Sequence, residues 1–385
     1  MSEREQKSLK VMTIIGTRPE IIRLSAVIKK LDRFCNHILV HTGQNFDYEL
    51  NNVFFEDLNL RMPDICLRVQ SDSLHGQLAN IIRETGEIME KAKPDAVLVL
   101  GDTNSALSVI NAKRLKIPIF HMEAGDRAFD ENVPEEINRR IVDGISDVLI
   151  AYTEHSRRNL LREGIHPSQI FISGSPVREV YEGLKDAFKK SKILTDLKLT
   201  PKKYITASIH REENVDIPGG LELMVASYNA LVEKYGFPVV VSTHPRTKRR
   251  LQKMQLLTKA HKKVMWHKPF GLVDYIWLQC NSFCVVSDSG TIHEDSSMLN
   301  FPAVAIRRST EKVESIDAGH TIISGLDPES VLRNVTIATE DAVNQEIAPM
   351  PEAYAQMNVS SKILRIVVGM AKIVDKKVWG DKKYV

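Results

Sequence analysis

The stretch HMEAGDRAFDENVPEEINRR, residues 121–140, decides the fold. It follows an apolar β-strand predicted over residues 117–120 and ends inside an amphipathic helix that Pro134 opens. A strand, a loop and a helix in this order are typical of an open α/β sheet, where ligands bind outside the carboxyl ends of the strands. We therefore expect a ligand site here, although most charged segments are solvated surface.

The segment 121–140 places carboxylic acids beside basic side chains. The acids are Glu123, Asp126, Asp130, Glu131, Glu135 and Glu136, and the basic residues are His121, Arg127, Arg139 and Arg140. Gly125 interrupts this run, at a point where the backbone could come close to a ligand. A second polar strand end, LGDTNS at residues 100–105, precedes the segment by one strand and contains Asp102. Two polar strand ends in succession favour a site over plain surface.

Strands and helices alternate along the chain, which predicts parallel sheets built from βαβ units. Strands are expected at residues 10–15, 37–42, 95–101, 117–120, 147–153, 169–177, 204–210, 238–244, 283–290 and 302–307. A charged stretch without a clear strand, residues 178–203, is the expected interdomain connection. The sequence thus predicts two Rossmann-type doubly wound domains: residues 1–180, joined by a C-terminal helix 359–385, and residues 200–358.

Composition narrows the class of protein. A chain of 385 residues exceeds what one core usually serves, and a net charge of +3, from 52 basic and 49 acidic residues, argues against nucleic acid or an anionic membrane as the main partner. No stretch approaches 18 apolar residues, and the polar start MSEREQKSLK is not a secretory signal. Scattered cysteines predict free thiols in the cytoplasm, and the histidines show no metal-ligand spacing, so no metal site is expected.

The turn GTRPE, residues 16–20, follows the first predicted strand. Pro19 lies in the first turn of a helix predicted over residues 20–32, so free backbone N–H groups and the helix dipole could hold an anion. Arg18 can add a bidentate contact to a phosphate, although an arginine that caps a neighbouring loop would look the same. Arg23 lies one turn further along and is a weaker candidate.

In the second half, DSGTIHED at residues 288–295 is the most informative stretch. Ser289 and Gly290 lie at a strand-to-helix turn that can bind a phosphate, while Glu294 and Asp295 could reach a ribose diol. A simple capping serine is the alternative. Arg307 ends the next strand, and FGLVDYIWL, residues 270–278, offers aromatic side chains on which a base could stack.

Seven motifs carry a family resemblance over nearly the entire chain: GTRPEIIR, LGDTN, HMEAG, VPEEINRR, HREEN, STHPR and SDSGTIHED. In this order they resemble the non-hydrolysing UDP-N-acetylglucosamine 2-epimerases. The wording of HTGQNFDYELN and SIHREENVD is similar to a capsule and O-antigen subgroup that forms UDP-N-acetyl-L-fucosamine or its 6-deoxy relatives.

The resemblance implies a GT-B-like fold: two domains facing a cleft, with UDP held mostly by the second. It places the leaving-group arginine at Arg18, with His210 and Arg307 as further cations for the departing diphosphate. The implied acidic catalytic positions are Asp102, Glu123 and Glu135. The substrate-binding residues expected from motifs and resemblance together are Arg18, Arg23, Arg139, His210, Phe270, Tyr275, Ser289, Gly290, Thr291, Glu294, Asp295 and Arg307. This chain departs from the family pattern at Arg23 (family lysine), Thr291 (glycine) and Asp295 (glutamate).

The implied reaction inverts carbon 2 of a UDP-N-acetylhexosamine by eliminating UDP to a 2-acetamidoglycal and adding it back. This route has no hydride step, so neither NAD nor a metal is expected. The sugar stays open between UDP-GlcNAc with UDP-ManNAc and a UDP-6-deoxy-L-hexosamine. A homodimer is also expected. Two other classes remain: a GT-B glycosyltransferase, which would share the DSG turn, and a nucleotide-sugar sensor, which would not need all three carboxylates.

Overall fold

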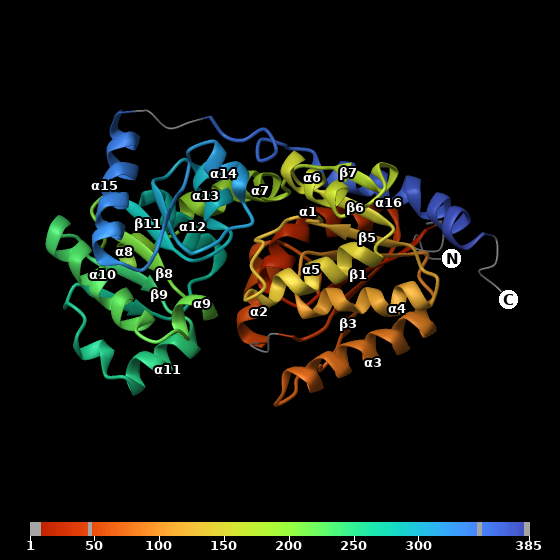
Figure 1. Ribbon diagram of the computed structural model, residues 1–385, viewed down its shortest axis with the longest axis horizontal. Helices are drawn as coiled ribbons and strands as arrows, with labels where there is room; N and C mark the ends of the chain where they lie inside the picture. Colours follow the sequence, from red (N-terminus) through yellow and green to blue (C-terminus); the bar gives the residue numbers. More distant parts are fainter. Residues whose placement is uncertain (1–8, 45–47, 345–348, 381–385) are drawn as a thin grey trace. The chain divides into compact units, whose positions relative to one another are not determined.

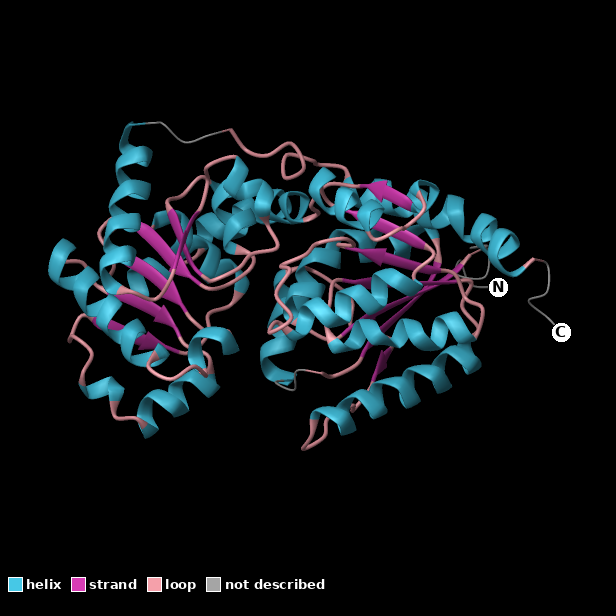
Figure 2. Ribbon diagram, viewed as in Figure 1, coloured by secondary structure: helices cyan, strands magenta, loops and turns pink. Residues whose placement is uncertain are grey.

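A computed structural model of the chain describes residues 9–44, 48–344 and 349–380. It divides into two compact units, Met1–Gly183 with Ala355–Val385, and Leu184–Tyr354. Each unit is a parallel β-sheet with helices on both of its faces (Figure 1, Figure 2). The predicted pair of doubly wound parallel-sheet domains is therefore confirmed.

The sheet of the first unit has the strand order β3-β2-β1-β4-β5-β6-β7. All neighbouring pairs are parallel. The strands are β1 (Lys10–Ile15), β2 (Asn36–His41), β3 (Ile65–Cys66), β4 (Ala96–Leu100), β5 (Ile119–Met122), β6 (Val148–Ala151) and β7 (Ile170–Ile172). The order reverses between β1 and β4, which makes their carboxyl ends the topological switch point at which ligands bind in such sheets.

The first unit contains the helices α1 (Arg18–Phe34), α2 (Tyr48–Asp57), α3 (Leu74–Ala92), α4 (Val109–Arg114), α5 (Pro134–Ile145), α6 (Glu154–Arg162) and α16 (Val359–Val374), and α7 (Val177–Lys190) continues into the second unit. Helices α3, α4 and α5 pack on a buried aliphatic core that includes Val97, Val99 and Ile119. The C-terminal helix α16 packs against α1, and the Ser360 N–H donates to Glu179 at 2.9 Å.

The second unit repeats the design with the strand order β10-β9-β8-β11-β12-β13. Its strands are β8 (Ile205–Ser208), β9 (Val239–Ser242), β10 (Val264–His267), β11 (Cys284–Ser287), β12 (Ala303–Ile306) and β13 (Ile322–Ser324). Its helices are α8 (Ile193–Asp196), α9 (Glu212–Val215), α10 (Gly220–Tyr235), α11 (Pro245–Lys253), α12 (Leu272–Asn281), α13 (Ile292–Leu299), α14 (Val313–Asp317) and α15 (Pro328–Asn344). Here the switch point lies between β8 and β11.

The strand predictions differ from the structure in two ways. The short strands β3, β10 and β13 were not predicted. Each of them lies at an edge of its sheet. The strand predicted over residues 117–120 is in fact Ile119–Met122, so the polar segment 121–140 begins inside the sheet. His121 can be a strand residue because both of its ring nitrogens have buried partners.

Two further observations complete the fold. The start of the helix predicted from GQNFDYELN falls partly on residues 45–47, which lie outside the described residues; α2 is described from Tyr48. Within the part of the chain that the structure describes, no helix is both long and apolar enough to cross a membrane.

Candidate functional site

The GTRPE turn differs from the prediction, because the side chain of Glu20, in the first turn of α1, accepts the backbone N–H groups of the turn. The carboxylate of Glu20 accepts the N–H of Gly16 at 2.9 Å, the N–H of Thr17 at 2.7 Å and the hydroxyl of Thr103 at 3.0 Å. The expected backbone anion site at Gly16 and Thr17 was therefore wrong: those donors are taken. Arg18 remains at the turn, with its guanidinium 5.5 Å from the centre of the Phe54 ring.

Glu20 should make the stability of the fold depend on pH. Burial raises the pKa of Glu20 to about 7, despite hydrogen bonds that favour the carboxylate. An acid whose pKa is higher in the folded chain stabilises the fold fully below its unfolded pKa, and that contribution is lost as pH rises through the folded pKa. Between pH 4.5 and 7, wild-type protein should lose roughly 3 kcal/mol of unfolding free energy relative to Glu20→Gln. Urea unfolding of both proteins from pH 4.5 to 8 measures this difference, and a constant difference would contradict the prediction.

Asp102 and Glu123 follow the neighbouring strands β4 and β5, and each is paired with an arginine. Arg139 of α5 pairs with Asp102, and Arg23 of α1 pairs with Glu123. The two acids are held near each other through Gly101, whose Cα faces the Glu123 carboxylate: a Cβ built there would lie 3.7 Å from Oε2. Glu123 has a φ of 62°, a strained backbone that an ordinary turn would avoid. The predicted acids Asp102 and Glu123 and the predicted arginines Arg23 and Arg139 thus form one cluster.

Glu135 is not joined to this cluster by a contact. It is exposed in the first turn of α5 and makes no hydrogen bond or ion pair with another described residue. Because Glu135 precedes Arg139 by four residues, both side chains lie on the same face of α5. Its neighbour Glu136 is buried and accepts the N–H of Ala128 at 2.9 Å. Glu136 therefore holds the loop, which leaves Glu135 available to a ligand.

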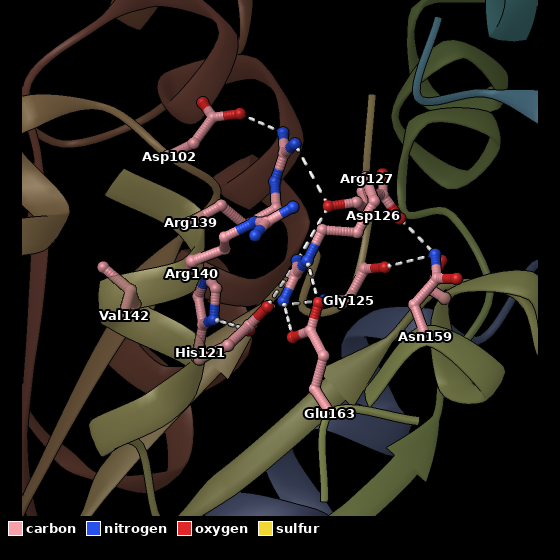
Figure 3. Close-up of polar contacts among 12 residues, drawn as sticks. Asp102, His121, Gly125, Asp126, Arg127, Arg139, Arg140, Val142, Asn159 and Glu163 are labelled. Atoms are coloured by element: carbon pink, nitrogen blue, oxygen red, sulfur yellow. Dashed lines mark hydrogen bonds and ion pairs between the residues drawn. The ribbon is translucent and has the colours of Figure 1, made fainter. Parts of the chain in front are cut away.

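Gly125 has a different role from the one predicted. Its φ is 82°, and a Cβ at this position would lie 2.3 Å from the carbonyl oxygen of Ser156 on α6. The backbone therefore needs glycine to pack against a helix, not to approach a ligand. Asn159 of the same helix donates to the Gly125 carbonyl at 3.0 Å (Figure 3).

In the second unit, the buried carboxylate of Asp288 fixes the turn that carries His210. It accepts the N–H groups of His210 and Arg211, at 3.0 and 2.9 Å to Oδ2, and lies 3.2 Å from Nδ1 of His210. Burial alone would raise the pKa of Asp288, but the charge of His210 and these hydrogen bonds hold it below its usual value. Asp288 thus joins the carboxyl ends of β8 and β11, and leaves His210 about half exposed, with a side-chain exposure of 47%.

A cationic pair surrounds the DSG turn. Arg307 is buried and pairs with Glu311 at 2.9 Å, and Arg211 lies 3.6 Å from the same carboxylate. A Cβ added at Gly290 would lie 2.8 Å from Glu311 Oε1 and 3.1 Å from Arg211, so this turn lies close to the ends of both charged side chains. The predicted Gly290 and Arg307 are thus brought together at one end of the second unit.

The predicted ribose region is built by side chains that contact one another. The hydroxyl of Thr291 donates to Asp295 Oδ2 at 3.0 Å and lies 3.1 Å from the hydroxyl of Ser289. Thr291 and Asp295 are two of the departures from the family pattern, and here they are partners. Glu294 and Asp295 are both buried, with 0% and 3% exposure, which leaves little carboxylate surface for a ribose in this structure.

The predicted aromatic residues lie at strand ends: Tyr275 contacts the carboxyl end of β8, and Phe270 contacts the carboxyl end of β10. The hydroxyl of Tyr275 on α12 donates to Ser208 at 3.1 Å, and burial raises the pKa of Tyr275 to about 12. Phe270 packs against the ring of His267, with ring centres 5.4 Å apart, and against a core cluster that contains Tyr204. Tyr275 and Phe270 therefore each contact other side chains of the second unit.

Sequence reasoning missed several residues that organise these turns: Asp288, Arg211, Glu311, Arg127 and Asp143. Asp288 and Arg211 stand inside motifs that were singled out, and strand-end position was the available signal for both. Asp143 and Glu311 lie in the interiors of unremarkable stretches, where only the folded chain shows their partners.

Two doubly wound units, one with arginine-paired carboxylates and the other with a cationic turn, thus place charged side chains at the carboxyl ends of their strands, where such sheets bind ligands. Residues 29–368 match the family described as UDP-N-acetylglucosamine 2-epimerase. The chain belongs to this family.

Relatives support the assignment over most of the chain. A UDP-N-acetylglucosamine 2-epimerase homolog of Methanococcus maripaludis is 38% identical over 85% of this chain and 92% of its own. A solved UDP-N-acetylglucosamine 2-epimerase from Rickettsia bellii is 48% identical, with a TM-score of 0.90, over 96% of this chain and 99% of its own. The Methanocaldococcus jannaschii enzyme, solved with UDP-GlcNAc and UDP, is 34% identical, with a TM-score of 0.87, over 94% of this chain and 100% of its own.

Two other matches bear on the alternatives. A UDP-2,3-diacetamido-2,3-dideoxy-D-glucuronate 2-epimerase of Pseudomonas aeruginosa is 33% identical over 85% of this chain and 91% of its own. A glycosyltransferase structure from Rickettsia africae, 13% identical over 95% of this chain and 98% of its own, has a TM-score of 0.57 and shows the shared fold alone. The predicted GT-B-like fold is confirmed, and the epimerase family is favoured over the glycosyltransferases.

Proposed function

We propose that this protein is a non-hydrolysing 2-epimerase that inverts carbon 2 of a UDP-N-acetylhexosamine. The observation that carries the proposal is the cluster at the ends of β4 and β5, where Asp102 and Glu123 each face an arginine. Carboxylates at adjacent strand ends can exchange protons with a bound sugar, and paired arginines fix their positions.

The chemistry needs both proton transfer and a stabilised leaving group. Removing the proton from carbon 2 while the bond from carbon 1 to oxygen breaks gives a 2-acetamidoglycal and UDP. Protonation of carbon 2 on the other face, with attack of UDP at carbon 1, then gives the epimer. Asp102, Glu123 and Glu135 are the proposed proton carriers.

The second unit supplies most of the proposed contacts to UDP. His210, Ser289, Gly290 and Arg307 lie at the ends of β8, β11 and β12, and Arg307 and Arg211 provide positive charge there. Cations at this position stabilise the negative charge that develops on the departing diphosphate. Arg18 is proposed as the corresponding cation from the first unit. Arg23 and Arg139 act by holding the carboxylates with which they pair.

A glycosyltransferase or a nucleotide-sugar sensor would use the second unit in the same way. Neither would need the buried Arg23–Glu123 pair beside the Asp102–Arg139 pair. An acceptor-free reaction separates the three functions: purified protein is incubated with UDP-GlcNAc in D₂O, and the anomeric signals are followed by NMR. We expect a second anomeric signal and deuterium at carbon 2, with turnover unchanged by EDTA or by added NAD. An unchanged spectrum with both UDP-GlcNAc and UDP-N-acetyl-L-fucosamine would reject the epimerase.

The identity of the sugar is the next prediction. The similarity to the capsule and O-antigen subgroup predicts a higher kcat/KM for UDP-N-acetyl-L-fucosamine than for UDP-GlcNAc, with slow turnover of the latter. A 6-methyl group can lie against apolar side chains, whereas an unpartnered buried hydroxymethyl group costs roughly 1 to 3 kcal/mol. The preference should therefore be about 10- to 200-fold. A higher kcat/KM for UDP-GlcNAc would reject the subgroup assignment and keep the epimerase.

We further propose that the protein acts as a cytoplasmic homodimer that supplies a precursor for a surface polysaccharide. Its four cysteines are free thiols, as a reducing compartment favours. Light scattering after gel filtration tests the assembly: a dimer has about twice the 43.5 kDa mass of the chain.

A further inference from the structure

A buried carboxylate, Asp143, contacts residues that precede and follow Glu123 in the chain. Asp143 lies on the inner face of α5 and is 1% exposed. Its Oδ1 is 2.8 Å from Nδ1 of His121, and its Oδ2 accepts the N–H of Gly125 at 3.1 Å. Oδ2 also pairs with Nη1 of Arg127 at 2.8 Å. One side chain therefore holds residues on either side of Glu123.

His121 extends this contact to Asp102. Its Nε2 lies 2.8 Å from the carbonyl oxygen of Gly101, the residue before Asp102. A carbonyl oxygen can only accept a hydrogen bond, so Nε2 of His121 donates to Gly101. Burial would raise the pKa of Asp143, but the charges of His121 and Arg127 hold it below its usual value. The His121 ring therefore links the Asp143 carboxylate to the Gly101 turn.

Arg127 completes the network on the side of α5 (Figure 3). It donates to the carbonyl of Asp126 at 2.8 Å, and Arg139, the partner of Asp102, donates to the same carbonyl at 3.2 Å. The other edge of Arg127 binds both oxygens of Glu163, at 2.8 and 2.5 Å. Burial would lower the pKa of Arg127, but these acids raise it, so Arg127 stays charged.

We propose that Asp143 is a positioning residue for the epimerase reaction. It touches no substrate; acting through His121 and Arg127, it fixes the turns that place Asp102 and Glu123. An ordinary buried ion pair would stabilise the fold without this effect. The contacts favour positioning, because they end within two residues of Asp102 and of Glu123. A displacement of about 1 Å can cost a hundred-fold in rate. The inference rests on the proposed function.

The variant Asp143→Asn tests this role. The amide oxygen can still accept from Gly125 and Arg127, but the amide NH₂ faces His121 and cannot accept a hydrogen bond from its ring. We expect kcat to fall about 10- to 100-fold, the range seen when outer-shell partners are removed. KM and the Kd for UDP should stay within threefold.

Asp147→Asn is the matched control. Asp147 is also buried and acts on β5, but at the opposite end: it accepts the N–H of Ile119 at 3.0 Å and pairs with Lys113 at 2.5 Å. The variant Asp147→Asn should lower the melting temperature without lowering kcat. Glu163→Gln is a milder variant, because the Glu163 side chain is 35% exposed and Asp143 stays in place. It should lower kcat about two- to fivefold through Arg127.

The outcomes separate the hypotheses. If wild-type protein does not epimerise UDP-GlcNAc or the 6-deoxy sugar, the proposed function fails. If wild type is active and Asp143→Asn keeps the kcat of Asp147→Asn, the positioning role is overturned. If Asp143→Asn does not fold, Glu163→Gln decides: a lowered kcat at unchanged KM supports the role, and a wild-type kcat overturns it.

Discussion

Asp102→Asn and Glu123→Gln are each expected to lower kcat by roughly a hundred-fold or more, the usual scale for an acid or base group. The Kd for UDP should stay within a few-fold, because the proposed diphosphate contacts are Arg18 and residues of the second unit, not these two acids. An amide keeps the size of the side chain and can still accept from Arg139 or Arg23, but it cannot carry a proton to or from carbon 2. Stopped assays of epimer formation, with calorimetry for UDP, measure both quantities.

Glu135→Gln should have a similar effect, although Glu135 is exposed and contacts no other described residue. Its expected role comes from a bound sugar, so its variant should melt at the wild-type temperature, whereas the two buried-pair variants should be less stable. Glu131→Gln, an exposed carboxylate of the same loop, is the control and should keep full activity. Near-normal turnover in all three catalytic variants would remove this cluster from the mechanism.

The positions of strand ends could be predicted from sequence, and with them most of the candidate residues. Apolar runs such as residues 10–15 and 95–101 identify buried strands, and the polar residues that follow them must lie at one edge of a parallel sheet. This is why Asp102, Glu123 and Arg307 were found. What a polar residue binds is decided by residues distant in the chain. Arg23 and Glu123 are 100 residues apart, and Asp288 and His210 are 78 apart.

Glycines and backbone donors were the least predictable features. Gly125 suggested a ligand, but α6 occupies the space beside it. The amides of Gly16 and Thr17 suggested an anion site, but Glu20 fills it from within the same turn. In both cases the local sequence correctly showed a special backbone and could not show which group would lie against it. His121 was placed in a loop for a related reason: a charged residue belongs in a strand only when buried partners are available.

Arg307→Met is expected to weaken UDP binding by about 2 to 5 kcal/mol, or roughly 30- to 5,000-fold in Kd. Arg307 is 1% exposed, and its guanidinium is 2.9 Å from Glu311 and close to Gly290. The methionine keeps much of the length and removes the charge. Both a diphosphate and Glu311 then lose their buried cation, and Arg211, 3.6 Å from Glu311, can replace it only in part.

Arg308→Met provides the control for that measurement, because Arg308 is the next residue and is exposed. It removes the same formal charge from the same loop, so long-range attraction of UDP changes equally in both variants and any further loss belongs to the buried guanidinium. Salt separates the two effects again: the loss in Arg308→Met should disappear at high ionic strength, whereas most of the loss in Arg307→Met should persist, since buried pairs are screened less. Titration calorimetry with UDP at low and high salt measures both. A Kd for Arg307→Met within threefold of that for Arg308→Met would place the diphosphate elsewhere, and the cationic turn of the second unit would then serve only the fold.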